Sequence, residues 1–165
     1  MKILTLPLLS LLTVAAAWCA DFAEPEQVPL TKAARYQESL LKAKSVVVRK
    51  SASYFANDGV LEIKGFKFYA KEFPVGPHDE IRAMLASSDL LGLFVKTRCE
   101  FNANYAVTWL NGQERMDALV CFGCAGIIFY GKGEELRYRF SSRSSADALR
   151  AHLVKLAGEP AASAE

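Results

Sequence analysis

The sequence predicts an α+β protein in which an antiparallel sheet packs against two to three helices. Within residues 105–140, four runs alternate apolar and polar residues, and glycine-containing turns separate them. Residues 30–44 and the stretch SSRSSADALRAHLVKLAGE at 141–159 instead space their apolar residues at helical intervals. Two successive hairpins in this stretch of residues 105–140 predict antiparallel pairing of each strand with the next. We therefore expect a four-stranded meander at about 105–140.

The elements before the meander are predicted from local patterns. Residues 30–44 predict an amphipathic helix, and the β-branched run of residues 46–48 predicts a strand. Residues 60–73 alternate apolar and charged side chains, which predicts one exposed strand with Gly65 at a bend or bulge. Residues 78–91 predict a second helix, with acidic residues in its first turn and a glycine after its end.

Two turns define the predicted meander. Asn111-Gly112 is a strong hairpin signal, and a two-residue loop there sets Leu110 opposite Gln113. Gly131-Lys132-Gly133 predicts a second hairpin on a three-residue loop. The final helix follows, with Ser144 or Ser145 expected to cap its start and Gly158 at its end.

The first residues predict export. Lys2 precedes an apolar run over residues 3–17, and an acidic stretch begins at Asp21, which is the order of a secretory signal peptide. The run is too short to span a bilayer, and no later segment has that length. We expect a periplasmic or extracellular protein that does not span the membrane. Its expected parts are a signal peptide over 1–20, a linker over 21–29, a single α+β domain over 30–158 and a disordered tail over 159–165.

Composition and motifs restrict the function further. The bulky Trp18 beside Cys19 disfavours a lipid anchor at that cysteine. The chain has 20 Lys and Arg against 18 Asp and Glu, which lacks the basic excess of nucleic-acid-binding proteins. It contains no G-x-S-x-G, no phosphate-binding glycine loop and no H-E-x-x-H. The sequence therefore indicates no catalytic residue and no cofactor, and it leaves the partner unknown.

Three cysteines remain after signal cleavage, and an oxidising compartment favours their pairing. Counting outward from the hairpin at Asn111-Gly112 places Cys99 opposite Cys124, at a site where cross-strand side chains lie closest. We therefore expect a Cys99–Cys124 disulfide, which leaves Cys121 as a candidate reactive thiol.

Other pairings remain open. A bulge within residues 102–104 would shift the register and pair Cys99 with Cys121 instead. A bond between Cys121 and Cys124 is disfavoured if they share one continuous strand, because their side chains would then point to opposite faces.

Two further hypotheses use the same cysteines. The C-F-G-C spacing suggests thiol–disulfide chemistry at Cys121 and Cys124, although no helix begins there to lower a thiol pKa. A metal-binding module would use Cys99 with that pair and take a fourth ligand from His78 or His152. Each histidine is isolated and lies on a predicted helix, so an ordinary structural position is favoured for both.

The stretch TRCEFNANYAVTW, followed by a hairpin and LVCFGCAGIIFY, resembles a pattern in small exported or lipid-anchored bacterial proteins that share Cys … Cys-Phe-x-Cys. The resemblance covers about residues 78–140. It implies that the three cysteines act together, and it implies no activity. We therefore expect a secreted or periplasmic, non-enzymatic domain with a structural or interaction role.

Overall fold

The computed structural model describes residues 29–94 and 100–158. The chain forms three α-helices, one 3₁₀ turn and nine strands within these residues. In chain order they are α1 (Leu30–Lys42), β1 (Val46–Lys50), β2 (Val60–Ile63), β3 (Phe66–Tyr69), β4 (Phe73–Pro74), α2 (Glu80–Ala86), η1 (Ser88–Leu90), β5 (Leu91–Gly92), β6 (Tyr105–Asn111), β7 (Glu114–Cys121), β8 (Gly126–Gly131), β9 (Glu134–Phe140) and α3 (Arg143–Ala157). None of the described helices has the length and apolar character needed to cross a bilayer.

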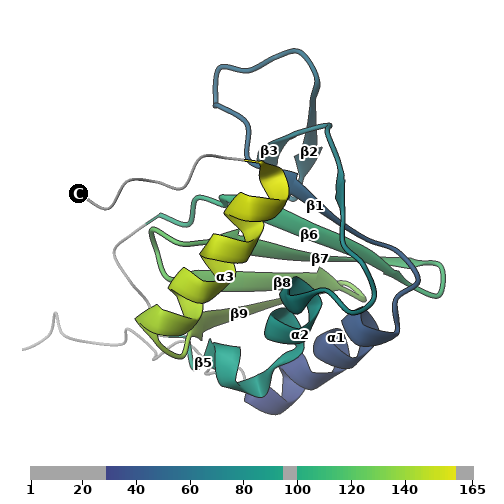
Figure 1. Ribbon diagram of the computed structural model, residues 1–165, viewed down its shortest axis with the longest axis vertical. Helices are drawn as coiled ribbons and strands as arrows, with labels where there is room; N and C mark the ends of the chain where they lie inside the picture. Colours follow the sequence, from purple (N-terminus) through teal and green to yellow (C-terminus); the bar gives the residue numbers. More distant parts are fainter. Residues whose placement is uncertain (1–28, 95–99, 159–165) are drawn as a thin grey trace, which may run out of the picture.

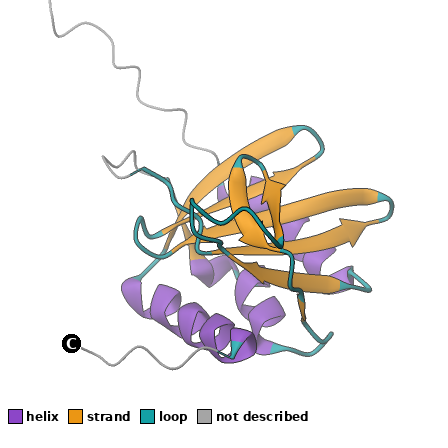
Figure 2. Ribbon diagram, turned by 90° about the horizontal axis from the view of Figure 1, so that it is seen from above, coloured by secondary structure: helices purple, strands orange, loops and turns teal. Residues whose placement is uncertain are grey.

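The predicted α+β class is confirmed. A seven-stranded antiparallel sheet has the order β4-β1-β6-β7-β8-β9-β5, and the helices lie together on one of its faces (Figures 1 and 2). The predicted meander is present as β6 to β9, within a sheet that β1, β4 and β5 make wider. Because each meander strand pairs with the next one along the chain, short hairpin connections suffice to build it.

Two hydrophobic clusters hold the layers together. The larger lies between the helices and the inner face of the sheet, where Trp109 and Phe129 meet Leu40, Leu85 and Leu149. All five side chains are almost fully buried. The indole N–H of Trp109 donates to Ser39 Oγ of α1 at 2.8 Å, so the largest core side chain also satisfies its polar atom.

A small hairpin covers part of the outer face. Strands β2 and β3 pair with each other, and Ile63 and Phe68 pack on Ala106, Leu119 and Ile128 of the large sheet. The prediction of one strand over residues 60–73 is therefore wrong. The backbone at Lys64 and Gly65 has φ of 53° and 84°, which produces a reversal where a bend was expected.

The register of β6 and β7 also corrects a prediction. Asn111 pairs with Glu114, so the loop residues are Gly112 and Gln113, and Leu110 lies opposite Arg115. Gly112 has φ of 68°, the left-handed value that the first position of a II′ hairpin turn requires. The two-residue shift leaves every side chain on its predicted face, which is why the alternation did not reveal the error.

Two other boundaries differ from expectation. Gly131 pairs with Glu134, which reduces the second hairpin loop to Lys132 and Gly133. The predicted helix over 78–91 ends at Ala86, and its last residues form η1 and then β5. Ser87 causes this early end, because its side chain accepts from Asp89 N at 3.1 Å and starts the next turn.

A buried arginine joins the helices to one edge of the sheet. Arg82 of α2 is 1% exposed, and its guanidinium donates to the carbonyl oxygens of Ala43 at 2.7 Å, Val75 at 3.0 Å and Leu40 at 3.5 Å. Burial lowers the pKa of this guanidinium, and the Asp79 carboxylate opposes that effect. One side chain thus connects the end of α1, α2 and the segment that follows β4.

Replacing Arg82 with leucine should destabilise the protein by about 3 kcal/mol, because buried carbonyl oxygens would lose their donors. Urea unfolding followed by circular dichroism measures the change. Arg137→Leu is the control, since its side chain is half-exposed and its loss should change stability by about 0.5 kcal/mol or less. Equal stability of the two variants would contradict a clamping role for Arg82.

Candidate functional site

A cleft of about 970 Å³ opens between α3 and one end of the large sheet. Its walls include Lys50 at the end of β1, Tyr105 at the start of β6 and Phe140 at the end of β9. The turn between β7 and β8 closes part of the same end. In Figure 1, α3 runs obliquely across the sheet, and α1 and α2 lie together beside its first turns. The cleft is therefore formed where the helical layer stops covering the sheet.

Aromatic rings form the floor of the cleft. The rings of Phe122 and Phe140 are stacked, with centroids 5.8 Å apart and planes 9° apart. Tyr105 meets Phe122 edge to face at 6.2 Å. All three side chains belong to or pack against the main core, and Tyr105 and Phe140 are themselves buried, so the floor is the rim of that core. An apolar or flat aromatic group could lie against it.

The wall on α3 is charged. Arg143, Asp147, Arg150 and Val154 line the cleft, because residues three and four positions apart share one face of a helix. Arg143 Nε lies 3.8 Å from Asp147 Oδ2, whereas none of the ion pairs among the described residues involves Arg150. The helix therefore presents one cation beyond its own ion pair to the cleft.

Arg139 adds a further cation from the sheet. It precedes Phe140 in β9, and its Nε is buried with no hydrogen-bond partner among the described residues. Tyr138 and Phe140 face the helices, so the Arg139 side chain leaves β9 on the outer face of the sheet. Its buried Nε therefore costs free energy that an anion beside α3 does not relieve. Among the charged residues that line the cleft, cations outnumber carboxylates.

The C-F-G-C segment forms the turn at the cleft. Strand β7 ends at Cys121 and β8 begins at Gly126, so the two cysteines do not share a continuous strand. Phe122 N donates to Asn104 Oδ1 at 2.7 Å, and Phe140 N donates to Ala125 O at 3.0 Å. These bonds fix the turn against β6 and β9, and Phe122 and Ala125 then line the cleft.

A disulfide closes this turn by joining Cys121 to Cys124, with Cα atoms 5.6 Å apart. A continuous strand would disfavour a bond between Cys121 and Cys124, yet this bond is the one observed. The chain reverses between the two cysteines and brings their side chains together. The register that placed Cys99 opposite Cys124 is wrong. Cys99 itself lies outside the described residues, so a Cys99–Cys124 bond stays a prediction.

Within the described residues, neither histidine forms a metal-binding group with Cys121 and Cys124. His78 is exposed before α2, and His152 Nδ1 lies 3.0 Å from Glu80 Oε2, which links α3 to α2. No group of three or more metal-binding side chains occurs within residues 29–94 and 100–158, a range that leaves out Cys99.

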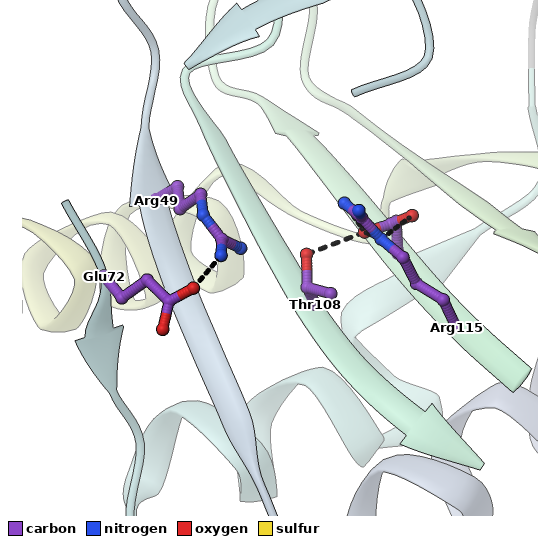
Figure 3. Close-up of polar contacts among 5 residues, drawn as sticks. Arg49, Glu72, Thr108 and Arg115 are labelled. Atoms are coloured by element: carbon purple, nitrogen blue, oxygen red, sulfur yellow. Dashed lines mark hydrogen bonds and ion pairs between the residues drawn. The ribbon is translucent and has the colours of Figure 1, made fainter. Parts of the chain in front are cut away.

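A second polar cluster lies on the outer face of the sheet (Figure 3). Asp117 is 3% exposed and accepts from Thr108 Oγ1 at 2.7 Å and from Arg115 Nη2 at 2.9 Å, so its carboxylate is well satisfied. Arg49 pairs with Glu72 across the neighbouring strands. The contacts of Asp117 saturate its carboxylate, whereas Nε and Nη1 of Arg49 are buried without a hydrogen-bond partner among the described residues.

Sequence patterns identified the turn and missed the rest of the cleft. The spacing of Arg143 and Arg150 on one face of α3 was the available signal, but it also fits a solvated helix surface. Arg139 gave no signal, because the alternation in β9 predicts only an exposed position.

Comparison with protein-family models, curated proteins and solved structures finds no match to this chain.

The disulfide predicts equal effects for its two cysteines. Cys121→Ser and Cys124→Ser should each lower stability by about 2 kcal/mol, the chain-entropy value for so short a loop, and the double variant should lose no more. Urea unfolding of the oxidised proteins measures the losses.

Peptide mapping of the unreduced protein provides the complementary measurement. It should yield Cys121 and Cys124 joined to each other, and the Cys99→Ser variant should yield the same linked pair. Recovery of a peptide that joins Cys99 to Cys124, or a large loss for Cys124→Ser alone, would contradict the observed pairing and support the alternative.

Proposed function

We propose that this chain is an exported, non-enzymatic binding domain whose cleft takes an organic anion with an apolar or aromatic part. The observation that carries the proposal is the combination of a stacked aromatic floor with arginines on the α3 wall of one cleft. A carboxylate, sulfonate or phosphate group would pair with Arg150 on α3, while the apolar part of the ligand would lie against Phe122 and Phe140. The expected signal peptide over residues 1–20 supports export.

The rigid turn suits a binding role. Hydrogen bonds from two neighbouring strands and the disulfide hold Phe122 in place, so little conformational entropy is lost when a ligand packs on it. The serines at the start of α3 satisfy one another and the helix end, since Ser142 Oγ accepts from Ser145 N at 3.1 Å. These contacts favour a structural role for the serines, and the held position of Phe122 favours a binding role for the cleft.

Anilinonaphthalene sulfonate is a suitable probe, because it joins a sulfonate to aromatic rings. Its fluorescence should rise on saturable binding to the folded protein, and Arg150→Ala should weaken the affinity roughly fivefold through the loss of a charge-assisted contact. Lys42→Ala is the matched control, because it removes an exposed cation from the end of α1. Equal affinities for both variants, or binding without saturation, would refute the proposal.

Thiol–disulfide exchange is a second candidate, favoured by the observed pairing of Cys121 with Cys124. A partner dithiol would pass two electrons to this bond, leaving two thiols here and a disulfide on the partner. The backbone N–H of Cys124 donates to Cys121 Sγ at 3.2 Å, a contact that would stabilise a Cys121 thiolate. Cys121 is only 2% exposed, which restricts attack at its sulfur.

Equilibration of the pair with glutathione buffers measures its reduction potential. A binding domain with a structural bond should show a value below about −300 mV, and this is the result we expect. A value in the range of about −270 to −120 mV, typical of oxidoreductases, would favour the second candidate. The Cys99→Ser variant keeps the measurement specific to Cys121 and Cys124.

A further inference from the structure

Two aromatic side chains stand out on the surface. Tyr54 and Phe55 are 82% and 85% exposed, the highest values among the exposed large hydrophobic residues of the described chain. They occupy the connection between β1 and β2, which rises away from the rest of the molecule at the top of Figure 1. Adjacent exposed rings on a projecting loop are typical of a contact surface.

The loop that carries these rings is held in place by hydrogen bonds. Lys67 of β3 donates to Tyr54 O at 3.0 Å and to Ala56 O at 3.4 Å, and its ammonium lies 5.6 Å from the centroid of the Tyr54 ring. The rings of Tyr54 and Phe55 meet edge to face at 5.6 Å. The tip is therefore pre-organised while both rings face solvent.

The loop begins at the wall of the cleft. Lys50 and Ser51 line the cleft, and Ser51 also bridges to Phe68 of the small hairpin. Tyr54 follows three residues later. An exposed aromatic tip thus continues directly from a cleft in which cations outnumber carboxylates.

We propose that the cleft and the aromatic tip together form a docking surface for an anionic lipid bilayer. The headgroup phosphate would bind Arg150 in the cleft, while Tyr54 and Phe55 enter the interfacial layer. This inference rests on the proposed function, because it assigns the anion bound by the cleft to a lipid headgroup.

The cationic cleft and the aromatic tip correspond to the two layers of an anionic bilayer surface. An anionic headgroup layer lies next to an apolar layer, and in this chain the exposed rings of Tyr54 and Phe55 follow closely after Lys50 and Ser51 of the cleft wall. Aromatic side chains favour that interface, because it accepts both an apolar ring and a polar tip. A small soluble anion could fill the cleft, but it would leave the tip without a contact.

Co-sedimentation with vesicles tests the proposal on the oxidised protein without its leader. The protein should bind vesicles of phosphatidylcholine and phosphatidylglycerol in equal parts, and it should not bind phosphatidylcholine alone. The double variant Tyr54→Ser/Phe55→Ser should weaken binding about tenfold through lost apolar burial. Arg150→Ala should weaken it about fivefold, the value for one cation near an anionic surface.

Leu110→Ser is the matched control for the tip. Leu110 is 53% exposed at the far end of β6, so its loss should leave vesicle binding unchanged. Equal binding to both vesicle types, or unchanged binding of the tip variant, would overturn the bilayer assignment. A tip variant that changes only the self-association of the protein, and not its binding to vesicles, would also overturn this assignment.

The sulfonate probe separates this inference from the proposed function. The Tyr54→Ser/Phe55→Ser variant should keep the full affinity for anilinonaphthalene sulfonate, because the probe needs only the cleft. A protein that binds the sulfonate and ignores anionic vesicles would overturn the lipid assignment and leave the proposed function standing. Failure to bind the sulfonate would remove the proposed function itself.

Discussion

The structure depends on one buried guanidinium. Arg82 supplies donors to carbonyl oxygens of α1, of the α1–β1 connection and of the segment after β4, so it fixes the helical layer against the edge of the sheet. Helix α2, which carries Arg82, also meets α3 through Glu80 and His152. The position of α3 then determines where one wall of the cleft stands. A contact deep among the helices thus acts on a surface site at the opposite end of the layer.

The cleft lies where the hydrophobic core reaches the surface. Phe122 and Phe140 belong to the aromatic packing that continues inward through Tyr105, while the facing side of α3 carries Arg143 and Arg150. Apolar and cationic surfaces meet there because a helix with a polar outer stripe crosses the end of a sheet. The disulfide in the adjoining turn keeps the aromatic side of this junction rigid.

Local periodicity predicted the class of fold and the meander, because the alternation of side chains is a property of each strand. It could not determine the register, since a shift of two residues preserves both faces. The β2–β3 hairpin was not predicted, because Lys64 adopts a left-handed backbone conformation that lysine rarely takes. The cleft escaped as well, because β1, β6, β9 and α3 come together only in the folded chain. The partners of Arg82 are backbone carbonyls, which no side-chain pattern can indicate.

The ends of the sheet have a consequence for association. Both outermost strands span two residues, β4 (Phe73–Pro74) and β5 (Leu91–Gly92), and Pro74 has no N–H to donate. On the part of β9 that β5 leaves open, Glu135 and Arg137 form an ion pair. A second chain would find little backbone to extend and charges to desolvate. Addition of a strand at either end of the large sheet is therefore disfavoured.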